Sequence, residues 1–152
     1  VPEYLRTEIL KPKETVATIS NAMDVGDPSN FVRILELFDK EFNQVKNKLS
    51  GYTIDDEETL KTIERVEKDY GYVLDPHGAV AFVALEKYLA ENGGKGFFLE
   101  TAHPVKFPDS VEQATGKSVE IPKSLEELMK QEKFTTEINP QYEELKEFLL
   151  KK

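Results

Sequence analysis

The pattern of apolar residues predicts an amphipathic helix in the first third of the chain. Its apolar stripe follows the helical spacing i, i+3, i+4 and i+7 and consists of Phe31, Ile34, Leu35, Phe38, Phe42, Val45 and Leu49. Asp27 is placed to cap this helix, and Pro28 occupies its first position. Because the stripe runs without interruption towards Gly51, we expect one continuous helix that packs through it.

Two further helices carry start and stop signals. A capping box begins at Asp55, which replaces the usual Ser or Thr, and Gly71 is a plausible C-terminal cap of the same helix. Asp75 and Pro76 begin the next helix as a cap followed by a proline. Residues 79–85 of this helix are apolar on all sides, which predicts burial between other layers of the structure.

Shorter helices are expected towards both ends of the chain. Residues 1–14 suit a short helix or a coil. Pro108, Pro122 and Pro140 each stand at the start of a short helical pattern, and the first of these patterns ends near Gly116. In the last one, we expect the apolar side chains to face inward.

Strands are expected in only two or three places. Residues 15–20 are rich in β-branched side chains, residues 72–74 suit an extended segment, and residues 97–101 begin with an apolar run that is typical of a buried parallel strand. The predicted fold class is therefore a helix-rich α/β fragment with five or six helices. A buried strand needs neighbours that this sequence scarcely supplies, and the chain begins at Val1 rather than Met, so we expect part of a larger α/β domain.

Composition excludes several function classes. The chain has 152 residues and a net charge of −9, whereas nucleic acids and anionic membranes attract clusters of Lys and Arg. No apolar run approaches the roughly 20 residues that a membrane helix needs. The chain has no cysteine, so it has neither a disulfide framework nor a thiolate nucleophile. This absence permits a reducing compartment, and we expect a cytoplasmic protein.

Some residues that suggest chemistry have simpler structural explanations. Residues 93–96 (GGKG) lack the Ser or Thr that follows Lys in a phosphate-binding loop, and they favour a turn between a helix and a strand. His77 lies at a helix N-terminus, where anions can bind, but local hydrogen bonding is the commoner role. With His103 as the only other histidine and no cysteine, we expect no metal site. Asp24 has no helix to cap, so we keep it as a functional candidate.

Polar side chains follow the end of each main predicted strand. Pro104 ends the strand over residues 97–101, because it lacks the N–H that a strand ladder needs. Thr101, His103 and Lys106 then lie where ligands bind in open α/β sheets, beyond the carboxyl end of a strand. From the residues alone, an ordinary strand end with loop residues remains an equal alternative. Residues 20–26 form the second polar strand end.

Four motifs in order resemble threonine synthases. They are residues 18–25 (TISNAMDV), 28–31 (PSNF), 75–81 (DPHGAVA) and 100–107 (ETAHPVKF). The resemblance covers the C-terminal third or so of such an enzyme. It implies a pyridoxal-phosphate-dependent lyase of fold type II, related to the tryptophan synthase β chain. Its reaction, a step of threonine biosynthesis, converts O-phospho-L-homoserine and water to L-threonine and phosphate.

The resemblance also implies roles for individual residues. Thr101 matches the residue that hydrogen-bonds the ring nitrogen of pyridoxal 5'-phosphate. The candidates for substrate contacts are Asn21, Asp24, Ser29, Asn30, His103 and Lys106. The Schiff-base lysine and the loop that binds the cofactor phosphate belong to the earlier part of such enzymes. The fragment alone is therefore expected to be inactive and to need that missing N-terminal part as its partner.

The resemblance divides the chain into two parts. Residues 1–117 would form a wall of the active site, and residues 118–152 would form a C-terminal helical tail. An alternative of a different class is a stand-alone helical module for interaction or regulation, which the capped, amphipathic helices also suit. The length of the parent open reading frame would discriminate between the two.

Overall fold

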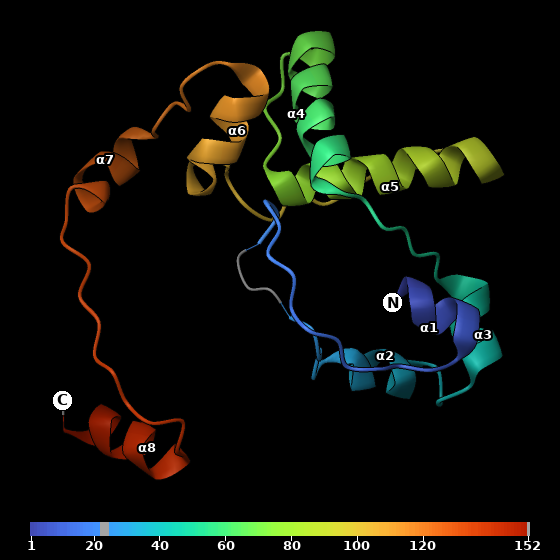
Figure 1. Ribbon diagram of the computed structural model, residues 1–152, viewed down its shortest axis with the longest axis horizontal. Helices are drawn as coiled ribbons and strands as arrows, with labels where there is room; N and C mark the ends of the chain where they lie inside the picture. Colours follow the sequence, from blue (N-terminus) through green and yellow to red (C-terminus); the bar gives the residue numbers. More distant parts are fainter. Residues whose placement is uncertain (22–24, 152) are drawn as a thin grey trace. The chain divides into compact units, whose positions relative to one another are not determined.

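The computed structural model describes residues 1–21 and 25–151 (Figure 1). Residues 1–120 and 121–152 form two compact units. The first unit contains six α-helices in its described part: α1 Pro2–Thr7, α2 Phe31–Leu37, α3 Phe42–Lys48, α4 Asp56–Tyr70, α5 Pro76–Asn92 and α6 Pro108–Thr115. A short 3-10 helix, η1, covers Pro104–Lys106. The second unit contains α7 Lys123–Met129 and α8 Tyr142–Leu150.

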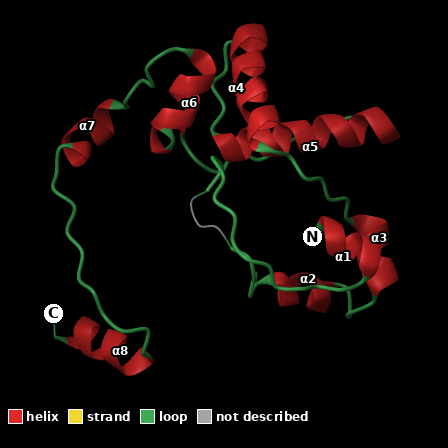
Figure 2. Cartoon of the chain, viewed as in Figure 1, coloured by secondary structure: helices red, strands yellow, loops and turns green. Residues whose placement is uncertain are grey.

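The α/β prediction is wrong, because the described residues contain no strand (Figure 2). The three segments predicted as strands, 15–20, 72–74 and 97–101, are irregular. A β-rich sequence forms a strand only when a neighbouring strand supplies hydrogen bonds and cross-strand contacts. Without such a neighbour, the side chains of Phe97 and Leu99 are 84% and 68% exposed.

Helices α4, α5 and α6 enclose the first hydrophobic core. α4 contacts both α5 and α6, and the buried members of this core are Ile63, Val66, Leu74 and Ala79. Phe82 and Phe98 pack against it with their ring centroids 5.4 Å apart. The predicted burial of α5 on all faces is wrong for this chain, because most of its apolar residues are only half-buried.

The predicted caps of α4 and α5 are confirmed. The Asp55 carboxylate accepts a hydrogen bond from the Glu58 N–H at 2.8 Å, and Gly71 ends α4 with a φ of 66°. Asp75 caps α5 with Pro76 at its first position. These signals are local in sequence, which explains why they could be identified without knowledge of the tertiary structure.

The predicted single helix over the first apolar stripe is broken into α2 and α3. Asp39 and Lys40 have φ values of 52° and 62°, which end the right-handed helix. The break lets the ring of Tyr4 contact both Phe31 and Phe42, at centroid distances of 4.9 and 5.5 Å. In one straight helix, these two residues would lie about 16 Å apart along the axis. The stripe is therefore correct as the lining of a second core, although its helix is not continuous.

The predicted cap at Asp27 is also wrong. Helix α2 has Asn30 at its N-cap, without a side-chain cap hydrogen bond. The N–H of Phe31 donates to the carbonyl of Pro28 at 3.1 Å, so a turn precedes the helix. The aspartate therefore stands one turn too early to serve as the cap.

The C-terminal unit confirms the two helices predicted after Pro122 and Pro140. The inward orientation expected for the last helix is wrong, since Tyr142 and Leu149 are 72% and 59% exposed. Among the described helices of the whole chain, none combines the length and the hydropathy required to cross a bilayer.

Candidate functional site around Asp75 and Glu100

Asp75 connects the motif 75–81 to its surroundings. Its side chain is completely buried at the N-terminus of α5. One carboxylate oxygen, Oδ1, accepts hydrogen bonds from the backbone N–H and from ring Nδ1 of His77, both at 2.8 Å. The predicted local hydrogen bonding of His77 is thus confirmed, and the aspartate fixes the orientation of the imidazole.

Glu100 reaches the same point from the start of the motif 100–107. Its Oε1 accepts a hydrogen bond from the backbone N–H of Asp75 at 3.0 Å. Gly78 makes room for this carboxyl group, since a Cβ atom at that position would lie 2.0 Å from Oε2 of Glu100. The glycine of one motif is therefore required by the glutamate of the other, and the two motifs form one site.

The two carboxyl groups differ in their affinity for a proton. Burial, together with a hydrogen bond to the Asp75 side chain and the charge of that side chain, raises the pKa of Glu100 to about 7. Burial alone would also raise the pKa of Asp75, but hydrogen bonds from Glu100 and His77 lower it below its usual value. Below pH 7, Glu100 is therefore the group that holds a proton, and Asp75 is the carboxylate.

The rest of the motif 100–107 is held by apolar and local contacts. Val105 is buried, and its N–H donates to Nδ1 of His103 at 3.2 Å. The ring of Phe107 meets the ring of His77 edge-on, with the centroids 5.0 Å apart. The side chains of Thr101, His103 and Lys106, on the same stretch, are exposed.

The candidates of the first two motifs are arranged differently. Ser29 and Asn21 are exposed, and Asn30 is exposed at the N-cap of α2. Asp24 lies outside the described residues. The N–H of Ile19 donates to Oδ1 of Asp56 at 3.3 Å, which ties this segment to the first turn of α4.

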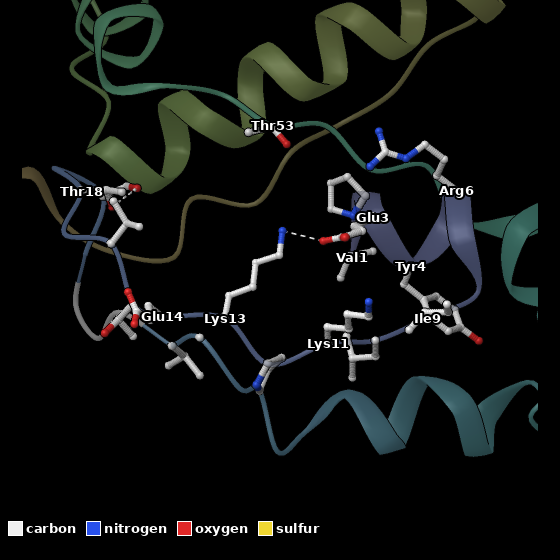
Figure 3. A pocket seen from close by; sticks show the side chains of 18 residues that line it. Val1, Glu3, Tyr4, Arg6, Ile9, Lys11, Lys13, Glu14, Thr18 and Thr53 are labelled. Carbon is white, nitrogen blue, oxygen red and sulfur yellow. Dashed lines mark hydrogen bonds and ion pairs between the residues drawn. The ribbon is translucent and has the colours of Figure 1, made fainter.

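A pocket of about 650 Å³ lies in this N-terminal part of the chain (Figure 3). Its lining comes from residues 1–28 and from Thr53, and it includes Thr18 and Ser20 of the first motif. Lys13 pairs with Glu3 inside it at 2.5 Å, so one of its positive charges is neutralised. The pocket is not lined by Thr101, His103 or Lys106.

The structure thus unites two of the four motifs, and it shows one residue that sequence reasoning missed. The sequence assigns no role to Glu100, because a single glutamate before a threonine carries no recognisable pattern. The available signal was Gly78 in the first turn of a helix, where glycine is unfavourable unless another group needs the space. Across residues 1–21 and 25–151, no group of three or more His, Cys, Asp or Glu residues could hold a metal ion.

Comparison with known proteins gives consistent matches. Residues 78–149 match the family model described as "Threonine synthase, C-terminal". Threonine synthase from Escherichia coli is 45% identical over 127 residues, which is 84% of this chain and 29% of that protein. The enzyme from Buchnera aphidicola subsp. Schizaphis graminum is 42% identical over 154 residues, covering all of this chain and 35% of that protein.

Solved structures match in the same way. The crystal structure of threonine synthase from Escherichia coli superimposes with a TM-score of 0.83 at 38% identity, covering 99% of this chain and 35% of that chain. The pyridoxal-phosphate-bound threonine synthase from Brucella melitensis gives a TM-score of 0.64 at 27% identity, covering 97% of this chain and 37% of that chain. The chain therefore spans about a third of the length of these relatives.

Proposed function

We propose that this chain, which belongs to the threonine synthase family and corresponds to its C-terminal segment, supplies one wall of a pyridoxal-phosphate site. The full enzyme would convert O-phospho-L-homoserine and water to L-threonine and phosphate. The observation that carries the proposal is the match to threonine synthases over the whole chain, in sequence and in structure. No observation favours the alternative of a stand-alone helical module.

Thr101 fits a role at the cofactor ring. Its side chain is exposed directly after Glu100, which bonds to the Asp75 N–H, so its hydroxyl can donate a hydrogen bond to a group placed against this wall. A hydroxyl is too weak an acid to protonate a ring nitrogen, so Thr101 would orient the ring and leave that nitrogen neutral. When bound, pyridoxal phosphate supplies an electron sink for chemistry at the amino-acid carbons. By leaving that nitrogen neutral, Thr101 would moderate the sink, which would suit elimination over transamination.

The remaining candidates fit the substrate. His103 and Lys106 are exposed on the same stretch as Thr101, and the ammonium group of Lys106 can bind a phosphate. Nδ1 of His103 accepts the Val105 N–H, which leaves Nε2 of the ring to carry a proton towards substrate or water. Asn21, Asp24, Ser29 and Asn30 are proposed as substrate contacts from the first two motifs. The Schiff-base lysine and the cofactor-phosphate loop would come from the remaining two thirds of the enzyme.

The experiment is a chimaera in which this chain replaces the matching third of the Escherichia coli enzyme. We expect it to release phosphate from O-phospho-L-homoserine, whereas the 152-residue chain alone should release none. Thr101→Val removes the hydroxyl while keeping the shape, and it should lower kcat by about tenfold or more, as loss of a charge-tuning hydrogen bond does. Thr101→Ser is the matched control and should retain most of the activity.

Two results would contradict the proposal. Equal kcat values for Thr101→Val and Thr101→Ser would remove the hydroxyl from the site. Turnover by the isolated chain would show that the missing two thirds are not needed. Urea unfolding of each variant separates an effect on catalysis from an effect on folding.

A further inference from the structure

Two buried carboxyl oxygens lack hydrogen-bond partners within the described part of the chain. They are Oδ2 of Asp75 and Oε2 of Glu100. Two ionised carboxylates can only accept hydrogen bonds, so they cannot satisfy each other. One proton on Glu100 would resolve this, because its carboxyl group could then donate to the side chain of Asp75, with which it interacts.

We propose that Glu100 is a positioning residue whose protonated carboxyl group bridges to Asp75 and fixes Thr101 against the first turn of α5. The inference rests on the proposed function only for the cofactor role of Thr101. The bridge itself concerns groups of this chain and is present without any ligand.

The contacts around Glu100 support a positioning role rather than a catalytic one. Asp75 is completely buried, so this pair cannot meet a substrate through it. Glu100 makes a second bond to the backbone N–H of Asp75, which fixes its carboxyl group at two points. At the far end of the stretch, Phe107 packs on His77, which Asp75 also holds. Residues 100–107 are thus fastened at both ends to the first turn of α5.

The stability of the bridge depends on pH, and the direction of this dependence follows from the pKa shifts of the two carboxyl groups. The pKa of Glu100 is raised from 4.5 to about 7, so its contribution to stability is complete below pH 4.5 and is lost as the pH rises through 7. The pKa of Asp75 is lowered, so its contribution is lost only in acid. The other titratable groups that face the pair are His77, which contacts Asp75, and Tyr72, whose own pKa is raised by burial and by both carboxyl groups.

The test uses the 152-residue chain and needs no cofactor. The variants are Glu100→Gln, which keeps an acceptor and a donor at the right places, Glu100→Ala, which keeps neither, and Glu143→Gln, which removes an exposed carboxyl group as a control. Amide hydrogen exchange at Asp75 should be roughly five to ten times faster in Glu100→Ala than in wild type, because one net hydrogen bond is lost. Glu100→Gln should restore the slow exchange, and the control should not change it.

A second readout follows Thr101 directly. In wild type, the NMR shifts of the Glu100 carboxyl carbon and of the Thr101 amide should titrate together with a midpoint near 7. In Glu100→Gln, the Thr101 transition should disappear. A Glu100 midpoint near 4.5, a Thr101 amide that does not follow Glu100, or identical exchange in the Gln and Ala variants would each overturn the proposal.

Failure of the proposed function would look different. A chimaera that carries the wild-type chain, folds and releases no phosphate would contradict the threonine synthase activity, whereas the NMR titration would still decide the bridge. In an active chimaera, kcat should fall as the pH rises through 7 in wild type, and it should stay level over that range in Glu100→Gln. The same fall of kcat in wild type and in Glu100→Gln would show that Thr101 does not depend on the bridge, and it would overturn the positioning role of Glu100.

Discussion

Residues 75–107 and residues 13–30 both carry motifs shared with threonine synthases, but the two regions are held differently. In the first region, the side chain of Asp75 is buried and bonds to His77, and its backbone N–H donates to Glu100. In the described part of the second region, which is irregular, the Lys13 N–H donates to the Gly26 carbonyl at 3.0 Å, and the candidates Asn21, Ser29 and Asn30 are exposed. One region has a buried polar anchor beneath its exposed side chains, whereas the described part of the other has none.

This difference bears on how a binding site is assembled from a single segment. Functional side chains need to be held within a fraction of an ångström, which requires neighbours that are themselves fixed by packing and hydrogen bonds. The 75–107 region has such neighbours within this chain. The 13–30 region would obtain them only from further contacts, such as those that the proposed full-length enzyme would supply.

The largest effects should come from the two hydrophobic cores. Val66 and Val45 have 3% and 0% exposure, and each belongs to one core. Either substitution to Ala should lower the free energy of unfolding by about 2 kcal/mol, because it removes buried methyl groups and leaves a cavity. Hydrogen exchange should show the loss of protection in α4–α6 for Val66→Ala and in α1–α3 for Val45→Ala. Equal loss in both regions for either variant would mean that the two cores unfold as one unit.

Gly78→Ala tests the polar anchor of the first region. The new Cβ would displace Glu100, so the buried N–H of Asp75 would lose its acceptor at a cost of about 1–3 kcal/mol. Alanine in a helix returns up to about 1 kcal/mol, so urea unfolding should show a net loss of about 1–2 kcal/mol.

The matched control is the same substitution in the Glu100→Ala background. The obstructing carboxyl group is absent there, so Gly78→Ala should become neutral or stabilising. A loss of the same size in both backgrounds would mean that the glycine serves some other purpose, and it would weaken the contrast between the two regions.

The features that could be predicted from the sequence are those with a local cause. The caps at Asp55 and Asp75 and the end of α4 at Gly71 each depend on a few neighbouring residues, and all three are confirmed. The apolar stripe of residues 31–49 correctly identified the second core. The break between α2 and α3 could not be predicted, because it depends on Tyr4, which is far away in the sequence and contacts the rings of both Phe31 and Phe42.

The strand predictions are wrong, and the role of Glu100 could not be predicted, for the same reason. A strand depends on a partner strand, and the β propensity of residues 97–101 says nothing about whether one is present. The bridge joins residues 25 positions apart, and neither Asp75 nor Glu100 is unusual in its own surroundings. The predicted site residues Thr101, His103 and Lys106 came from the resemblance, and their roles remain predictions.

The smallest effect compares Asp55, which caps α4, with Asp27 of the 13–30 region. Asp55→Ala removes a cap bond to the Glu58 N–H and should lower the free energy of unfolding by about 1 kcal/mol. Asp27 is exposed and does not cap α2, so Asp27→Ala should change it by less than about 0.5 kcal/mol. Urea unfolding of both variants measures the difference. A cost at Asp27 that equals the cost at Asp55 would show that residues 13–30 hold a fixed, capped structure in solution, and it would remove the contrast between the two motif regions.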